Sequence, residues 1–148
     1  MTKRFVDTYL LYLLARASSE VSAQFHDRLK SHELQVPEWR VLASLSDGDG
    51  MTVGELANRA LQHQPTMTKT IDRMEKSGLV DRRQGEPDRR QVRIFITAEG
   101  RRRIVAALKE AKHHEKEVLA EYSADEAQRL KSMLQTLIER NGALPSVD

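Results

Sequence analysis

Apolar residues near the start of the chain recur at spacings of three and four positions. This spacing places them on one face of an α-helix, because a helix completes a turn about every 3.6 residues. The pattern predicts a long amphipathic helix from about residue 3 to residue 31. The stripe on its apolar face consists of Leu10, Leu14, Ala17, Val21, Phe25 and Leu29.

Two shorter helices are predicted to follow. Pro37 stands in the first turn of one, where its missing N–H is harmless, and the glycine-rich segment 47–50 ends it. Thr52 and Glu55 have the spacing of a capping box, in which each side chain satisfies a backbone N–H of the other residue. The second helix therefore begins there and ends near Ala60.

The next predicted helix, residues 64–77, separates apolar from polar residues clearly. Met67, Ile71 and Met74 fall on its inner face, and Gly78 provides the left-handed stop at its end. The remaining positions form a polar outer face. The residues expected to point outward are Gln64, Pro65, Thr66, Lys69, Thr70 and Arg73.

Two segments after this helix, 79–83 and 92–97, alternate between apolar and polar residues as the strands of a ribbon do. The loop between them ends in Asp88-Arg89-Arg90. Two short helices, a glycine stop and an arginine-rich hairpin are typical of a winged helix-turn-helix. We assign this domain to residues 35–98, and it indicates binding to duplex DNA.

The end of the chain is predicted to hold two further helices. Thr97 caps the first, which runs to about Tyr122, and Ser123 with Glu126 has the spacing of another capping box. The second helix closes at Asn141-Gly142. Its apolar seam consists of Leu130, Met133, Leu134, Leu137 and Ile138.

The apolar stripes at both ends of the chain have no partner in the middle domain, which fills its own small core. We therefore predict that residues 1–34 and 99–148 form a helical dimerisation region. The fold class is mainly α with a small β-wing. The alternative is a monomeric bundle of the terminal helices.

Charge is distributed unevenly, although the net charge is only +2. Residues 59–103 hold 12 Lys and Arg against 6 Asp and Glu, whereas residues 1–58 and 104–148 each hold 6 against 8. A basic block over a helix-turn-helix and wing is the pattern expected for contact with DNA phosphates. Aromatic residues, at 5% of the chain, are too few for a platform that stacks single-stranded bases.

The chain contains no cysteine, which excludes disulfides, thiolate zinc sites and thiol redox sensing. The apolar run 9–15 superficially resembles a secretory signal, but Asp7 precedes it and the helical stripe continues beyond it. We expect a cytoplasmic protein without a membrane partner or a cofactor. The sequence holds no glycine-rich phosphate loop, His-Glu-x-x-His motif or nucleophile elbow, so we do not expect an enzyme.

Several short motifs stand in a fixed order along the chain: Leu56-Ala57-Asn58-Arg59, Gln64-Pro65-Thr66, Ile71-Asp72-Arg73-Met74-Glu75, Gly78-Leu79-Val80, Asp88-Arg89-Arg90 and Thr97-Ala98-Glu99-Gly100. In this order and spacing they resemble the MarR family of bacterial transcription regulators, over roughly residues 5–141. The resemblance implies a homodimer, a pseudo-palindromic operator, a small-molecule effector and, as the commoner mode, repression.

The resemblance also implies roles for individual residues. In the major groove it places Gln64, Pro65, Thr66 and Lys69, and on the DNA backbone Thr68, Thr70 and Arg73. At the wing it places Arg90 in the minor groove beside Arg89, with Asp88 orienting a neighbouring arginine. Three positions depart from the family pattern: Gln35 before the second helix, Leu61 where a turn glycine is common, and His63 as the cap of the recognition helix.

Elementary chemistry agrees with these roles. A glutamine side chain can bind adenine through two hydrogen bonds, lysine can reach guanine acceptors, and threonine can contact a thymine methyl group. A narrow minor groove attracts arginine through its negative potential. The alternatives are an ordinary solvated helix face and a hairpin whose arginines, including Arg82, Arg83 and Arg93, only confer solubility.

Other candidate sites are less defined. Arg16, Trp39 and Arg40 are candidates for an effector pocket, because an arginine beside an aromatic ring suits an aromatic carboxylate; the alternative is a core tryptophan with solvated arginines. Glu110, Glu117 and either His113 or His114 have helical spacing for part of a metal site, but the two histidines cannot share a face. Rival functions are therefore a metal-responsive regulator and a winged helix that binds proteins.

Overall fold

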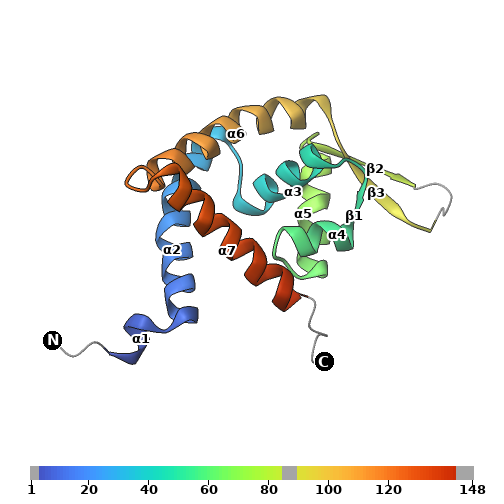
Figure 1. The fold of residues 1–148 in the computed structure, drawn as a ribbon. Helices are drawn as coiled ribbons and strands as arrows, with labels where there is room; N and C mark the ends of the chain where they lie inside the picture. Colours follow the sequence, from blue (N-terminus) through green and yellow to red (C-terminus); the bar gives the residue numbers. More distant parts are fainter. Residues whose placement is uncertain (1–3, 85–89, 143–148) are drawn as a thin grey trace. The chain divides into compact units, whose positions relative to one another are not determined.

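The computed structural model describes residues 4–84 and 90–142, which are mostly helical with one small antiparallel sheet (Figure 1). The chain divides between Lys112 and His113 into two compact units. The elements are α1 (Phe5–Thr8), α2 (Leu10–Leu29), the 3-10 turn η1 (Lys30–His32), α3 (Val36–Asp47), β1 (Met51–Thr52), α4 (Val53–Arg59), α5 (Gln64–Lys76), β2 (Val80–Gln84), β3 (Val92–Ile96), α6 (Ala98–Val118) and α7 (Ala124–Gly142). The predicted fold class is confirmed.

The first helix is not continuous, and this part of the prediction is wrong. Tyr9 has an extended backbone, with φ −74° and ψ 127°, and separates α1 from α2. The Tyr9 ring stacks on Phe5 at 5.0 Å between centroids, and the Thr8 hydroxyl donates to the Phe5 carbonyl. Because apolar residues continue on both sides of one extended residue, their spacing does not reveal the break.

The helix boundaries in the middle of the chain follow the predicted signals. The Glu55 N–H donates to the Thr52 hydroxyl oxygen at 3.2 Å, which is one half of the predicted capping box. Gly78 has a φ of +77° and ends α5, where the Leu79 N–H reaches back to the Met74 carbonyl at 2.9 Å. The predicted glycine stop is therefore confirmed.

The sheet has three strands in the order β1-β3-β2, all antiparallel, and not the predicted two. Met51 pairs with Ile94, and Val80 with Ile96. A strand of two residues is too short to show alternation in the sequence. Asp49 lies just before β1, and its Oδ1 accepts the Ile96 N–H at 2.9 Å. This bond continues the hydrogen bonding between β1 and β3 beyond the end of β1.

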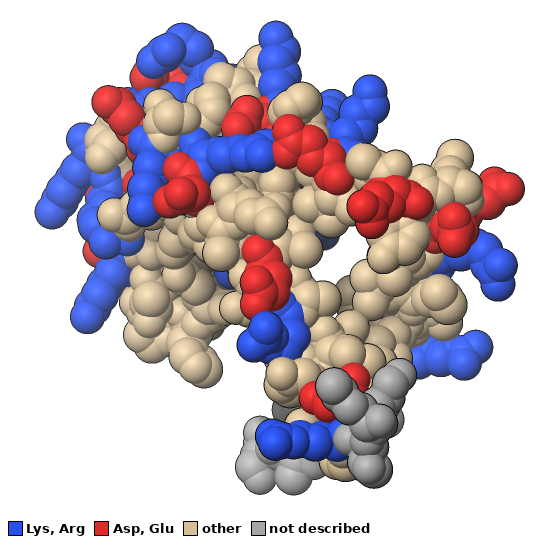
Figure 2. Space-filling model, turned by 90° about the vertical axis from the view of Figure 1, so that its left-hand side faces the viewer, with Lys and Arg blue, Asp and Glu red and all other residues tan. Residues whose placement is uncertain are grey.

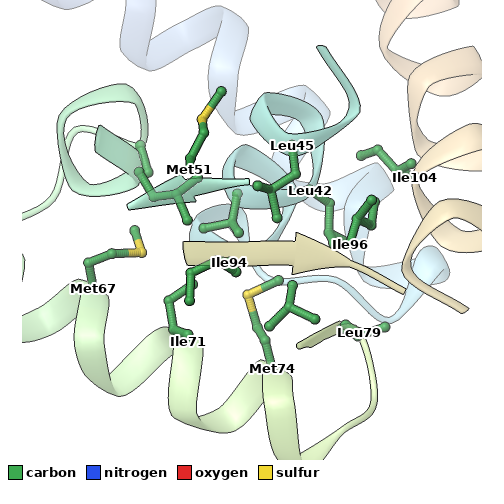
Figure 3. Packing of buried hydrophobic residues seen from close by; sticks show 14 of the residues in the cluster. Leu42, Leu45, Met51, Met67, Ile71, Met74, Leu79, Ile94, Ile96 and Ile104 are labelled. Atoms are coloured by element: carbon green, nitrogen blue, oxygen red, sulfur yellow. The ribbon is translucent and has the colours of Figure 1, made fainter. Parts of the chain in front are cut away.

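The hydrophobic core lies between α5, the sheet and α3 (Figure 3). From α5, Met67, Ile71 and Met74 point towards Ile94 of β3, and all four are fully buried. On the other side of β3, the core is completed by Leu42 and Leu45 of α3 and Ile104 of α6, while Leu79 lies beside Met74 on the α5 side. The core therefore holds α5 by one face only.

The start of α6 is joined tightly to the end of α5. The Thr97 hydroxyl donates to the Gly78 carbonyl at 2.7 Å and accepts the Gly100 N–H at 3.0 Å, so it caps one helix while bonding to the end of the other. A Cβ atom on Gly100 would lie 2.3 Å from the Leu79 carbonyl oxygen and 2.8 Å from an Ile96 side-chain carbon. Only glycine fits this approach of helix to backbone.

The second unit contains the end of α6 and α7. Here α6 ends at Val118 and not near Tyr122 as predicted, because residues 119–122 form a turn with the Tyr122 N–H bonded to the Leu119 carbonyl at 3.0 Å. Ser123 and Glu126 make both bonds of the predicted capping box, at 3.0 and 3.1 Å. The predicted α7 is confirmed.

No helix in the residues that the structure describes is both long and apolar enough to cross a membrane. The predicted grouping of residues 1–34 with 99–148 concerns the assembly of copies of the chain, and it stays a prediction.

Gly100→Ala should destabilise the protein by about 3 kcal/mol, because the added methyl group meets backbone and not a flexible side chain. Chemical denaturation followed by circular dichroism measures this loss. Gly54→Ala is the matched control: its Cβ would lie 3.8 Å from the nearest atom, so the helix preference of alanine should stabilise α4 by up to about 1 kcal/mol. Equal stability of the two variants would contradict the packing at Gly100.

Candidate nucleic-acid interface

The outer face of α5 carries polar and basic side chains with no cover from the rest of the described chain. The side chains of Gln64, Pro65, Thr66, Thr68, Lys69 and Arg73 are exposed. The fully buried Met67, Ile71 and Met74 fix which face points inward. Because the inner face is anchored at three successive turns, the outer side chains are held at a fixed orientation.

Thr70 does not belong to this outer face, and its predicted outward position is wrong. Its side chain is only 2% exposed, and its hydroxyl donates to the Thr66 carbonyl at 3.1 Å. Thr70 follows Met67 by three residues and precedes Met74 by four, so helical geometry places it on the buried side. Its hydroxyl is satisfied within the helix, and its methyl group suits the buried side.

The turn between α4 and α5 is tight despite its leucine. The Gln62 N–H bonds to the Ala57 carbonyl at 2.9 Å, and the Leu61 N–H bonds to the Asn58 carbonyl, as in a Schellman motif. Leu61 accordingly has a φ of +57°, in the left-handed region that favours glycine. The departure from a turn glycine therefore leaves the geometry of the turn intact.

An arginine from α3 reinforces the end of α4. Arg40 donates from its guanidinium to the Ala60 carbonyl at 3.1 Å. A cation at a helix C-terminus also interacts favourably with the helix dipole. Arg40 was not predicted to have this role, since a residue 20 positions away in sequence gives no sign of it.

The start of α5 is marked by His63 and Pro65. His63 occupies the N-cap position with an extended backbone, and its side chain makes no capping hydrogen bond. Pro65 stands in the first turn, where no N–H is needed. His63 is exposed, and so is Gln64, the first residue of α5.

Three of the arginines predicted around the wing have structural roles. Arg82 on β2 donates to the carboxylate of Asp72 on α5, and its backbone N–H donates to Glu75 at 3.2 Å. Arg83 lies over the Phe95 ring at 4.5 Å. Arg93 donates to the Gly50 carbonyl at 2.8 Å. These contacts fix the wing to α5 and to the β1 edge.

The tip of the wing is only partly described. Arg90 is exposed just before β3. Asp88 and Arg89, which the sequence predicts as wing residues, lie outside the described residues. The placement of Arg90 is compatible with contact to a ligand beyond the wing, and its minor-groove role stays a prediction.

Part of the basic block is paired with acidic side chains at the surface of the protein. On α6, Glu99 bonds to Arg102 at 2.6 Å and to Arg103 at 3.2 Å, and Arg101 lies 3.4 Å from Asp49. The hydrogen bond from Arg102 is the main reason why the pKa of Glu99 falls to about 2. Acidic and basic side chains also lie next to one another on the face shown in Figure 2. On α5, by contrast, Lys69 and Arg73 are basic residues of the exposed outer face.

The three candidate effector residues do not meet in one site of this chain. Trp39 packs edge-on against Phe25 at 5.1 Å, and Arg40 is engaged with Ala60. Arg16 is exposed and pairs with Glu20 at 2.9 Å. It lies nine residues before Phe25 on the same helix, which is about 13 Å along the axis.

A partly buried histidine lies close to Arg40. The pKa of His26 is lowered, first by burial and then by the positive charge of Arg40. Further along the chain, His113 pairs with Glu117 at 2.9 Å, whereas His114 is 6% exposed. Residues 4–84 and 90–142 contain no group of three or more His, Asp or Glu side chains arranged to hold a metal ion.

Comparison with known proteins finds relatives in sequence and in structure. The sequence profile described as the MarR family matches residues 34–92. The homoprotocatechuate degradative operon repressor of Escherichia coli is 29% identical over 129 residues, which are 87% of each protein. The transcriptional regulator TtmR of Methylorubrum extorquens is 34% identical over 96 residues, and the match spans only 49% of its length.

Solved structures agree with the sequence relatives. A MarR family transcriptional regulator from Silicibacter pomeroyi is 42% identical, with a TM-score of 0.82 over 93% of this chain and 98% of that chain. The transcriptional repressor CouR, solved on a 23-mer DNA duplex, is 27% identical with a TM-score of 0.82, over 93% of this chain and 97% of that one. The likeness thus extends well beyond the helix-turn-helix.

Proposed function

The chain belongs to the MarR family of transcriptional regulators, and we propose that it is a ligand-responsive repressor that binds a pseudo-palindromic DNA operator as a homodimer. DNA binding and transcription regulation are what its relatives share. Repression is supported by two of them, which are named repressors. The assembly, the operator and the effector are the parts that need experiments.

One observation carries the DNA-binding part of the proposal. The outer face of α5 is polar and basic while its inner face is fully buried, and Arg82 fixes the wing beside it. We propose that Gln64, Pro65, Thr66 and Lys69 contact base edges in the major groove and that Thr68 and Arg73 contact the DNA backbone. Arg90, with Arg89, would enter the minor groove, which attracts arginine.

Operator binding should weaken steeply with salt, with a log–log slope of about −0.9 for each phosphate neutralised. Lys69→Ala should relax base choice at one position per half-site and lower affinity by about 1–3 kcal/mol. Arg90→Ala should weaken all operator variants to a similar degree and make the slope less negative. Fluorescence anisotropy on a set of operator duplexes at several salt concentrations measures both effects.

Lys109→Ala is a suitable control for these two variants, because Lys109 is an exposed basic residue of α6, outside α5 and the wing. It should bind DNA like the parent chain. A salt slope near zero for the parent would reject the DNA-binding proposal. Parent-like binding by Arg90→Ala would show that the wing does not reach the minor groove.

Exposed apolar residues support a homodimer. On the first unit, Phe5, Leu10 and Leu11 are 74%, 53% and 59% exposed; on α7, Met133 and Ile138 are 61% and 68% exposed. Monomeric proteins rarely leave apolar faces of several turns in water. We propose that α1, α2 and α7 bury these faces against a second copy, as the grouping of residues 1–34 with 99–148 predicts.

Leu134→Asp should weaken the dimer by about 3 kcal/mol, because the carboxylate would be buried without a partner. Leu134 is 37% exposed in the single chain, so the substitution should leave the monomer folded. Light scattering at micromolar concentration should give twice 16.9 kDa for the parent and a lower mass for the variant. The control is Gln135→Asp, which changes an exposed polar residue of the same helix. A parent mass near that of the monomer would refute the dimer.

We propose that a small organic anion, such as an aromatic carboxylate, releases the protein from DNA. The relative from Escherichia coli is named for the degradation of homoprotocatechuate, an aromatic acid. Trp39 and Arg40 are adjacent on α3, and a carboxylate beside the Trp39 ring could accept from Arg40 in place of the Ala60 carbonyl. Losing this bond would loosen the turn that leads into α5. Arg16 remains a candidate only if a partner's helix brings it near.

Benzoate, salicylate and their thioesters, titrated against the operator complex, should include at least one compound that releases the DNA. Hydrogen peroxide should not act quickly or reversibly, since the chain has no thiol. Arg40→Leu should reduce the response to the active compound, whereas Lys109→Ala, on an exposed residue of α6, should leave it unchanged. Reversible release by peroxide alone would overturn the proposed effector class.

A further inference from the structure

Leu61 combines two unusual properties in the turn before the recognition helix. Its φ of +57° lies in the left-handed region, which is unfavourable for a residue with a Cβ atom. Its side chain is also 78% exposed, more than that of any other large apolar residue among those the structure describes. A glycine would avoid the strain, and a polar residue would avoid the exposure.

The conformation of Leu61 is fixed by its surroundings. Hydrogen bonds on both sides of it, from its own N–H to Asn58 and from Gln62 to Ala57, hold the turn. Arg40 holds the preceding Ala60 carbonyl at 3.1 Å. The backbone therefore cannot rotate to bury the side chain within this chain, and the leucine remains available at the surface.

The position of Leu61 is as unusual as its conformation. It lies three residues before Gln64, the first residue of α5, and both Gln64 and the preceding His63 are exposed too. In helix-turn-helix proteins the N-terminal end of the recognition helix contacts base edges in the major groove. The only apolar group that base edges present there is the C5-methyl of thymine.

We propose that Leu61 is a specificity-determining residue, whose side chain contacts a thymine methyl group next to the bases contacted by Gln64. The inference rests on the proposed DNA-binding function. Contact with the methyl group would bury apolar surface that is otherwise in water on both partners, and this is favourable.

The test replaces thymine by deoxyuridine, which removes the methyl group and keeps every hydrogen-bonding group of the base. An operator is first selected from a pool of random duplexes with the full-length protein, and each thymine of a half-site is then replaced in turn. The parent should lose about threefold to tenfold in affinity at one position per half-site. Leu61→Gly should bind the thymine and deoxyuridine duplexes equally at that position.

Two measurements separate this contact from a structural effect. Leu61→Gly should unfold at a higher temperature than the parent, because glycine relieves the left-handed strain. Lys69→Ala, which changes a different position of the same interface, should keep the preference of the parent for thymine at the Leu61 position.

Each outcome decides a different point. If Leu61→Gly retains the thymine preference of the parent at every position, the proposed contact is wrong while salt-sensitive DNA binding stands. If Leu61→Gly loses the dimeric mass, Leu61 lies between copies of the chain and the inference is also wrong. If the parent shows no salt-sensitive binding to any duplex, the proposed function itself has failed.

Discussion

The whole arrangement depends on the burial of one face of α5. Met67, Ile71 and Met74 are fully buried against β3 and α3, so three successive turns of the helix are anchored. This anchoring leaves the opposite face in water with its side chains in a defined order. A helix that reads DNA needs both conditions, since binding is strongest when the contacting groups are already held in place.

Several basic side chains of this protein bond to other parts of the fold, whereas others are exposed on the outer face of α5. Arg82 bonds to Asp72, Arg93 to the Gly50 carbonyl, and Arg102 to Glu99, although all three count towards the basic block of the sequence. Exposed ion pairs such as that of Arg102 add little stability. They do reduce the positive charge around α6, as the pairing of Arg82 with Asp72 reduces it at the wing.

The sequence predicted those features that arise from local rules. The amphipathic α5, the glycine stop and the capping box at Ser123 follow from spacing and residue type, and all are present. Features set by contacts across the chain were missed. The two-residue β1 is defined by its pairing with β3, which is more than 40 residues away in sequence. Arg40 bonds to the Ala60 carbonyl only when α3 and α4 pack together in the folded protein. Thr70 shows that helical position decides burial where residue type alone is ambiguous, because it is buried although threonine is polar.

The same contacts give a physical route from the N-terminal helix to the DNA-binding surface. Phe25 of α2 packs edge-on against Trp39 of α3, and the next residue, Arg40, holds the end of α4. Because α3 is a regular helix with Leu42 and Leu45 in the core, Trp39 and Arg40 move together. The proposed effector would act on the turn at Leu61 if it shifted α2 against α3, or if its carboxylate bound the Arg40 guanidinium in place of the Ala60 carbonyl. Because that turn sets where α5 begins, a small change at Arg40 would alter the position of the residues proposed to contact bases.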